Sequence, residues 1–448
     1  MVVLLRDNRL LFRPRLLYSR DRLVQLENVA SHRQCRGPIR ERPQVRRKGR
    51  PYRNLGWMRG LGTGGAHQLN VGTGPKAQFF PNLEAARGIA ALMVALFHIG
   101  QAYFFNSAGL QRSLIAPAGK TLEFTWSDQF FRILGNGPGA VVLFFVLSGF
   151  VLTLVLQQGA ERGVVKASRF FLARVCRIYP AVITSIAIFV ALFFSTGLSL
   201  TSPEQYSPWI IFLNGLLLST TIDGVMWSLQ LELIAAPLIF LVWLAWMRFG
   251  NKALTVTFVV LVILSFTRTW NHLIGPPAAF GQLHAFIAGM AAFLCGRKIV
   301  DRLHRPALWL AGMIVGFALS RAVIGWSSNW TILSETLFGA ATVALLAFGR
   351  FNSREARITG LARFFGRISF SFYLLHPLTM TLFASAAPTL TTIVNAGIHP
   401  LVVVTAAFVC SVAAITPLAW LQYQYIERPF IKFGRSLRFD LRAAIRPA

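Results

Sequence analysis

The chain has 448 residues, of which 54% are hydrophobic and 14% charged, and its formal net charge is +29. This composition is too apolar for an ordinary soluble enzyme of that length, so a bilayer is expected to surround most of the chain. The positive charge does not indicate nucleic-acid binding, because the basic residues lie in the N-terminal stretch and in short segments between apolar runs. Four cysteines at scattered positions indicate neither a disulfide framework nor a zinc site.

The N-terminal stretch differs from everything that follows it. Residues 1–78 are rich in Arg, contain scattered Pro and Gly, and include no apolar run long enough to cross a membrane. They are predicted to form a disordered, basic cytoplasmic extension. A translation start at Met58 is an alternative that the sequence leaves open. Residues 79–432 are predicted to form the membrane domain, and residues 433–448 a basic cytoplasmic tail.

The apolar runs after residue 80 are each near the roughly 20 residues that an α-helix needs to cross a bilayer. They are apolar on every side instead of alternating, which favours helices over the strands of a barrel. The predicted fold class is therefore all-α, a polytopic transmembrane helix bundle of about ten spans. The expected spans are 83–105, 137–156, 178–197, 227–247, 253–270, 276–296, 307–324, 334–349, 368–388 and 401–421.

The segments between these spans alternate between rich and poor in Lys and Arg, as the positive-inside rule requires. Residues 198–226, 325–333 and 389–400 contain neither Lys nor Arg, whereas the segments on the other side carry several each. The segment after the first span, with Arg112, Lys120 and Arg132, fits this alternation less well. Both termini are predicted to be cytoplasmic, and the protein is expected to be integral to the bacterial inner membrane.

Ionisable residues inside apolar runs are candidate functional residues, because charge in a bilayer is costly unless it is paired or hydrated. The first span carries Glu84, Arg87 and His98. At about 100° per residue these side chains share one helical face, and Arg87 and His98 lie roughly 16 Å apart along the axis. This face of the helix therefore extends from the cytoplasmic interface, at Arg87, to a position past the middle of the membrane, at His98. The alternatives are an interface anchor, in which Arg87 pairs with Glu84, and a packing histidine at His98.

The fourth span opens with Trp227-Ser228-Leu229 and carries Glu232 roughly 8 Å below the outer edge of the apolar region. This depth matches that of His98. Glu232 is therefore predicted to orient the imidazole ring, which would act as general base toward a hydroxyl. The alternative is a structural acid that bonds to Ser228 on the same helical face.

Other candidates border the apolar runs. His376 is followed by Pro377, which interrupts the helix, so His376 could line a cavity or stabilise a kink. Arg174 and Arg177 share a helical face at the cytoplasmic end of the third span, where they would attract an anionic cytosolic ligand or lipid headgroups.

Small residues around Ser148 and Gly149 would allow helices to pack closely, and they make Ser148 a candidate for lining a site. Glu335 lies near the end of a span, where it could simply face water, and it receives no role.

In their order along the chain, several motifs resemble the membrane acyltransferase family called acyltransferase type 3, over about residues 80–432. Each motif alone is weak evidence for the resemblance, but this many motifs in the same order along the chain are specific for the family. The sequence departs from many relatives at Leu233, where they carry a second acid. The matching features are Arg87 and His98, Leu147-Ser148-Gly149-Phe150, Arg177-Ile178-Tyr179-Pro180, Trp227-Ser228-Leu229 with Glu232, Tyr373-Leu374-Leu375-His376-Pro377 and Glu427-Arg428-Pro429-Phe430.

The resemblance implies transfer of a short acyl group, commonly acetyl, from cytosolic acyl-CoA to a hydroxyl of an extracytoplasmic or lipid-linked carbohydrate. It implies that His98 is the catalytic histidine and Glu232 a site acid, with Arg87, Arg174 and Arg177 on the donor side. Acyl-CoA is expected as co-substrate, with no bound cofactor and no metal. The expected partners are acyl-CoA, a carbohydrate or glycolipid acceptor and membrane lipid, and nucleic acid is not expected.

Two other classes of function fit the composition. A transporter or flippase could use the same charges to move a polar substrate without covalent change, although no internal repeat pairs corresponding broken helices. A regulatory or sensory membrane protein would give the buried charges no chemical purpose. Within the acyltransferase hypothesis, the sequence leaves open the acceptor and the choice between acetyl, succinyl and another short acyl group.

Overall fold

A computed structural model describes most of the predicted membrane domain. The predicted N-terminal extension, the segment around Arg112 and Lys120, and residues 437–448 of the predicted tail lie outside the described residues. The described residues are 80–104, 130, 133–158, 163–267, 279–326, 328–351 and 358–436.

The described residues form helices and no strands, and eight of the helices are long and apolar enough to cross a membrane. This arrangement confirms the all-α, polytopic membrane bundle; the number of spans and the location of the termini stay predictions. The α-helices are α1 (Pro81–Phe104), α3 (Gly137–Gln157), α4 (Gly163–Thr196), α5 (Pro208–Gly215), α6 (Trp227–Phe249), α7 (Asn251–Phe266), α8 (Leu283–Val300), α9 (Pro306–Ile324), α10 (Asn329–Phe348), α11 (Ile358–Leu375), α12 (Pro377–Asn395), α13 (Pro400–Gln422) and α14 (Arg428–Ser436). Short turns η1 (Pro203–Tyr206), η2 (Gly224–Met226) and η4 (Phe280–Gln282) and the π-helix η6 (Tyr423–Glu427) join some of them.

Several of the expected spans differ from the observed helices. The span expected at 178–197 is the second part of α4, which has 34 residues and begins at Gly163. The span expected at 368–388 is divided between α11 and α12, which meet at His376. The physical reason is Pro377, which has no backbone N–H to donate and is favoured at the first position of a new helix. The span expected at 253–270 corresponds to α7, whose 16 residues are short for crossing a bilayer.

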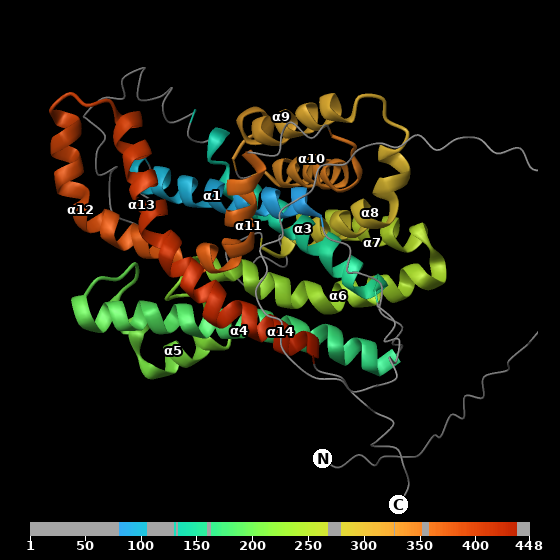
Figure 1. Ribbon diagram of the computed structural model, residues 1–448, viewed down its shortest axis with the longest axis horizontal. Helices are drawn as coiled ribbons and strands as arrows, with labels where there is room; N and C mark the ends of the chain where they lie inside the picture. The colour runs from blue at the N-terminus through green and yellow to red at the C-terminus, as the bar shows by residue number, and fades with distance from the viewer. Residues whose placement is uncertain are drawn as a thin grey trace, which may run out of the picture. The chain divides into compact units, whose positions relative to one another are not determined.

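Helix α1 occupies the centre of the described bundle (Figure 1). It packs against α11 on one side and against α3 on the other, and α10 in turn packs against α3. Two apolar cores meet at α1: one contains Phe145, Phe150 and Phe286, and the other contains Ile178 and Phe372. The central helix is therefore held on both faces, which fixes the direction of its polar side chains.

Glycines allow the closest helix contacts of the bundle. A Cβ atom at Gly88 of α1 would collide with the backbone of α11, and one at Gly366 of α11 would collide with the backbone of Glu84. The same relation holds between Gly149 of α3 and Gly289 of α8. These contacts confirm that small residues near Ser148 serve close helix packing.

The outward faces of several helices are apolar and exposed. Ile183 of α4, Ile263 of α7 and Val323 of α9 have more than half of their surface exposed, at 56%, 60% and 78%. Such a surface would be costly in water and is ordinary for helices that contact lipid. The exposed apolar side chains, together with the buried charged residues described below, are features of a membrane protein.

Candidate functional site

Arginine and carboxylate side chains meet in the interior of the bundle, around two small cavities of about 40 and 30 Å³. Both cavities are lined by Arg87 of α1, Phe144 of α3, Arg177 of α4 and Glu232 of α6. We call this region the arginine chamber. The sequence analysis selected Arg87, Arg177 and Glu232 separately, from three different spans, and the fold brings them together.

Arg174 connects α3, α4 and α6 in this chamber. Its Nη2 atom donates to Ser148 Oγ at 3.0 Å and to Glu232 Oε2 at 3.2 Å. The Arg174 side chain is only 8% exposed and its Nε atom has no hydrogen-bond partner among the described residues. A buried N–H without a partner is unfavourable, so this donor is available to a ligand that enters the chamber.

Another acid, Glu427 of the π-helix η6, lies close enough to the chamber to interact electrostatically with its arginines. Its Oε2 atom accepts a hydrogen bond from Ser371 Oγ of α11 at 3.0 Å, and it lies within electrostatic range of Arg87 and Arg177. Isolated π-turns inside helices are common at functional sites, because they redirect one side chain inward. The sequence analysis quoted Glu427 in a motif but gave it no role.

The arginines in the chamber outnumber its acids. Arg87 lies within electrostatic range of Arg174, Arg177, Glu232 and Glu427. Within the described part of the chain, the Arg87 and Arg177 guanidinium groups make no hydrogen bond. The region therefore has excess positive charge and spare donors, which suits a phosphate group or another anion.

Two histidines lie further along α1, past the chamber. His98 Nδ1 and His376 Nε2 are 2.8 Å apart, and the two rings are nearly parallel, with centroids 5.0 Å apart and an interplanar angle of 10°. His376 Nδ1 lies 2.7 Å from the carbonyl oxygen of Tyr373. His376, a candidate for lining a cavity or for stabilising a kink, is thus the direct partner of His98.

The hydrogen-bond partners determine the tautomers of two neutral histidines. The Tyr373 carbonyl can only accept, so His376 Nδ1 carries the hydrogen and His376 Nε2 is an acceptor. His98 Nδ1–H must then donate to His376 Nε2. The lone pair of His98 is therefore on Nε2, which is the atom that could take a proton from a substrate.

The pair expected between His98 and Glu232 is not formed. Glu232 bonds to Arg174, and His98 bonds to His376. Ser228, expected as an alternative partner of Glu232, exchanges a hydrogen bond with the Tyr373 hydroxyl at 2.9 Å. Helix spacing predicts only depth along each span, and depth alone does not select the partner across a helix interface.

Tyr373 lies between the chamber and the histidines. Its side chain lines the larger of the two cavities, and its ring centroid is 5.7 Å from that of His376. Phe144, which lines both cavities, contacts the Tyr373 ring at 6.0 Å. The two parts of the site are thus adjacent, with Tyr373 and Phe144 at the boundary.

Glu84, like His98, is a candidate on the polar face of α1 that lines neither cavity. It lies within electrostatic range of Arg367 and Arg363 of α11 as well as of Arg87. The sequence left open that Glu84 pairs with Arg87 as an interface anchor. The structure agrees with this in part, because the Glu84 carboxylate interacts with Arg87 and also with the two arginines of α11.

A separate buried ion pair, which the sequence analysis did not find, joins α9 and α10. Arg321 Nη2 and Nε donate to the two carboxylate oxygens of Glu335, both at 2.8 Å, and Nη1 donates to the Trp326 carbonyl oxygen at 2.6 Å. Asn136 accepts from Arg321 Nε at 2.9 Å and donates to Glu335 Oε1 at 2.8 Å. Glu335 is fully buried, so the interpretation that it faces water is wrong.

No group of three or more His, Cys, Asp or Glu side chains is placed to hold a metal ion in the described ranges between residues 80 and 436.

The comparisons with known proteins agree with the resemblance. Residues 80–420 match the model of a family described as "Acyltransferase domain". "Nodulation protein 10" of Rhizobium leguminosarum bv. viciae is 29% identical over 161 residues, which are 31% of this chain and 41% of that protein. The chain thus spans less than half the length of this curated relative. No solved structure matches.

Proposed function

Because the chain belongs to the acyltransferase type 3 family, whose model covers residues 80–420, we propose that it transfers a short acyl group from acyl-CoA to a carbohydrate hydroxyl. The donor is cytosolic, acetyl-CoA in the first instance, and the acceptor is an extracytoplasmic or lipid-linked carbohydrate. The enzyme acts in the bacterial inner membrane and needs no bound cofactor. The tautomer of His98, with a lone pair on Nε2, is the observation that carries this proposal.

The arginine chamber is the donor side of the proposed site. Coenzyme A carries phosphate groups, and guanidinium groups bind phosphate through charge-assisted hydrogen bonds. The spare donors of Arg87, Arg174 and Arg177 support this assignment, as does the placement of Arg177 near the predicted cytoplasmic boundary. Glu232 and Glu427 hold the arginines in position while the chamber is empty, since they offset part of the positive charge.

His98 is the general base of the proposed reaction. Its Nε2 atom takes the proton from the acceptor hydroxyl while the hydroxyl oxygen attacks the thioester carbonyl carbon. The carbon–sulfur bond then breaks, and the departing coenzyme A thiolate receives the proton from the His98 imidazolium. The products are the ester and free coenzyme A, so atoms and charge balance.

His376 is a positioning residue in this reaction. It accepts from His98 Nδ1–H, which fixes the ring and keeps Nε2 as the basic atom. The same hydrogen bond stabilises the imidazolium that forms when His98 is protonated, because His376 Nε2 offers it a lone pair. Glu232, for which the helix spacing predicts this role, bonds to Arg174 instead.

The path along α1 supports a reaction that spans the membrane. Arg87 and His98 are eleven residues apart, roughly 16 Å along the helix axis. A donor whose phosphates lie in the chamber would extend its acyl end past Tyr373 and Phe144 toward His98. The acceptor hydroxyl would then reach His98 from the opposite side of the membrane.

The test is mass spectrometry of surface glycans from cells that lack the gene and from the same cells carrying the wild-type or a variant gene. We expect wild type to restore a mass difference of one acyl group. His98→Ala should lower acylation by about a hundredfold to ten-thousandfold, the usual effect of losing a general base. His304→Ala is the matched control, because His304 is exposed in the segment between α8 and α9.

Membrane levels of each variant are measured in parallel, so that loss of protein is not taken for loss of chemistry. Full acylation by a normally folded His98→Ala variant would contradict the mechanism. Movement of a glycan across the membrane without covalent change, and without use of acyl-CoA, would favour the transporter or flippase instead.

A further inference from the structure

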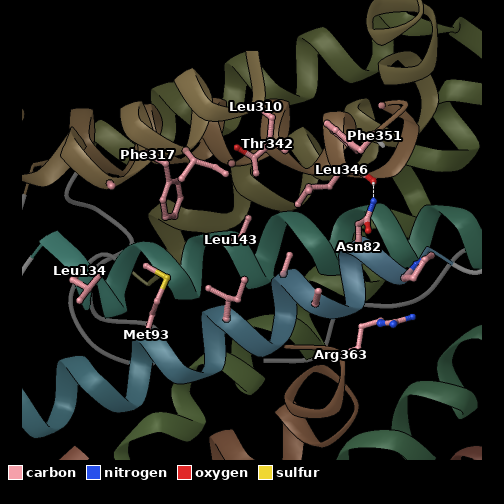
Figure 2. Close-up of a pocket in the computed structure, with 18 of the residues that line it drawn as sticks. Asn82, Met93, Leu134, Leu143, Leu310, Phe317, Thr342, Leu346, Phe351 and Arg363 are labelled. Atoms are coloured by element: carbon pink, nitrogen blue, oxygen red, sulfur yellow. Dashed lines mark hydrogen bonds between the residues drawn. The ribbon is translucent and has the colours of Figure 1, made fainter. Parts of the chain in front are cut away.

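A large apolar groove lies beside α1 (Figure 2). Its volume is about 940 Å³, and α1, α3, α9 and α10 form its walls. Met93, Leu143, Leu310, Phe317 and Leu346 line it, and Figure 2 shows them converging from the surrounding helices. The volume lies within the usual range for ligand sites, about 300–1,000 Å³.

The two sites use different faces of the same helix. At about 100° per residue, the α1 residues of the groove lie roughly 110° to 170° around the helix from the direction of Arg87 and His98. A ligand in the groove would therefore contact α1 without entering the arginine chamber. The α1 residues that line the groove are Asn82, Ala85, Ala86, Ile89 and Met93.

The groove is open along its side. Ile89 is 51% exposed, Leu134 is 53% exposed and Ile314 is 49% exposed, although all three line the groove. The surrounding helices α1, α3, α9 and α10 are each long and apolar enough to cross a membrane, so this opening faces the hydrocarbon of the bilayer. An occupant can enter sideways from the membrane.

One end of the groove is cationic. Arg350, which is exposed, and Arg363 of α11 line this end, where Asn82 Nδ2 donates to the Leu346 carbonyl oxygen at 3.2 Å. Arg363 also lies within electrostatic range of Glu84, as does Arg367, so among the described residues near this end the cations outnumber the carboxylate. By the positive-inside rule, the segment between α10 and α11 lies at the cytoplasmic boundary.

We propose that this groove binds one anionic glycerophospholipid of the cytoplasmic leaflet. The acyl chains lie along the apolar wall of α1, α3, α9 and α10. The phosphate lies at Arg350 and Arg363, where guanidinium groups can form charge-assisted hydrogen bonds to it. The charge of the groove end selects this occupant over a zwitterionic lipid, which would fit the apolar wall equally well.

Native mass spectrometry of the purified full-length chain tests the proposal, with added dioleoyl phosphatidylglycerol or dioleoyl phosphatidylcholine as probes. We expect one phosphatidylglycerol per chain, bound at least about tenfold more tightly than phosphatidylcholine, because each charge-assisted hydrogen bond is among the stronger ones. The double variant Arg350→Gln/Arg363→Gln should lose this preference and keep its phosphatidylcholine affinity. Lys298→Gln/Arg302→Gln is the matched control, since Lys298 in the last turn of α8 and Arg302 between α8 and α9 are both exposed and line no part of the groove.

A separate variant tests the apolar wall. Ile89→Trp places a larger ring in the groove from a half-exposed position, and we expect it to weaken binding of both lipids. Ile183→Trp on the outward face of α4 is its control and should change neither. Equal affinity of wild type for both lipids would overturn the proposal. A preference for phosphatidylglycerol that survives in the double arginine variant would also overturn it, as would control variants that lose as much lipid binding as the groove variants.

Discussion

Two buried sites in this bundle contain arginine, and they differ in how many of the guanidinium donors have a hydrogen-bond partner. The Arg321 guanidinium donates to both oxygens of Glu335, to Asn136 and to the Trp326 carbonyl, and both charged side chains are almost fully buried, at 7% and 0% exposure. In the arginine chamber, Arg174 has an Nε atom without a partner, and Arg87 and Arg177 make no side-chain hydrogen bond within the described residues.

The difference separates a structural cluster from a candidate binding site. A buried ion pair is maintained when every donor and acceptor is satisfied, and it then has nothing left to offer a ligand. A cluster with unused donors and excess charge is unfavourable by itself and becomes favourable when an anion enters. The two clusters should therefore respond differently to the loss of one arginine.

The largest effect is expected for Arg321. Arg321→Met leaves the buried Glu335 carboxylate with only Asn136, and removal of one member of a buried pair lowers the free energy of unfolding by about 3–5 kcal/mol. Thermal and denaturant unfolding in detergent measure this change. The double variant Arg321→Met/Glu335→Leu should recover most of the loss, because no charge stays unpaired. Equal stability of wild type and Arg321→Met would remove the distinction between the clusters.

Arg177→Gln is expected to act on binding instead of stability. Removal of one of three clustered arginines relieves repulsion with Arg87 and Arg174 but also removes part of the attraction to Glu427, which keeps Arg87 nearby. Because these contributions oppose each other, the free energy of unfolding should change by less than about 1 kcal/mol. Affinity for coenzyme A, measured by calorimetry, should fall by about tenfold to a hundredfold, the loss of one hydrogen bond to a charged group. Arg297→Gln is the control, since Arg297 is exposed and pairs only with Asp301 four residues away. Unchanged coenzyme A affinity in Arg177→Gln would argue against the chamber as the donor site.

Part of this arrangement could be predicted from the sequence, because it depends on periodicity within one helix. The common face of Arg87 and His98 follows from eleven residues of helix, and the positions of Arg174 and Arg177 follow from a spacing of three. The break at Pro377 follows from the missing backbone N–H. These properties need no knowledge of which helices are neighbours.

The partners of these residues could not be predicted, because they depend on packing between distant segments. His98 and His376 are separated by 278 residues, and Arg174 and Glu232 by 58. Depth in the membrane left several partners for His98, and only the close approach of α1 and α11 at Gly88 and Gly366 selects His376. Glu427 is recognisable in the sequence, because an acid near the end of an apolar run is rare. The expected spans end before it, so no role is predicted for it.

A buried acid for which the described residues supply no arginine partner extends the comparison, and its expected effect appears only as a dependence of stability on pH. Asp223 precedes η2, outside the membrane-spanning segments, and is fully buried. Its Oδ1 atom accepts from Val225 N at 3.3 Å, whereas Oδ2 has no partner among the described residues. Burial raises the pKa of Asp223 from 3.8 to about 8. The nearby ionisable groups are the phenols of Tyr206 and Tyr373.

The sign of the pH dependence follows from this raised pKa. Between pH 4 and pH 8 the folded chain keeps a proton on Asp223 that the unfolded chain has lost, so the free energy of unfolding falls as pH rises. The slope from this group is about 1.4 kcal/mol per pH unit, and it vanishes above the folded pKa. Burial and the Asp223 charge raise the pKa of Tyr206, so its phenol stays protonated throughout this range. Asp223→Asn, which keeps an oxygen for Val225 N, should remove the slope in denaturant unfolding measured at pH 6, 7, 8 and 9. A variant with the same slope as wild type would show that another group carries the dependence, and that a buried acid here is tolerated in its charged form without an arginine.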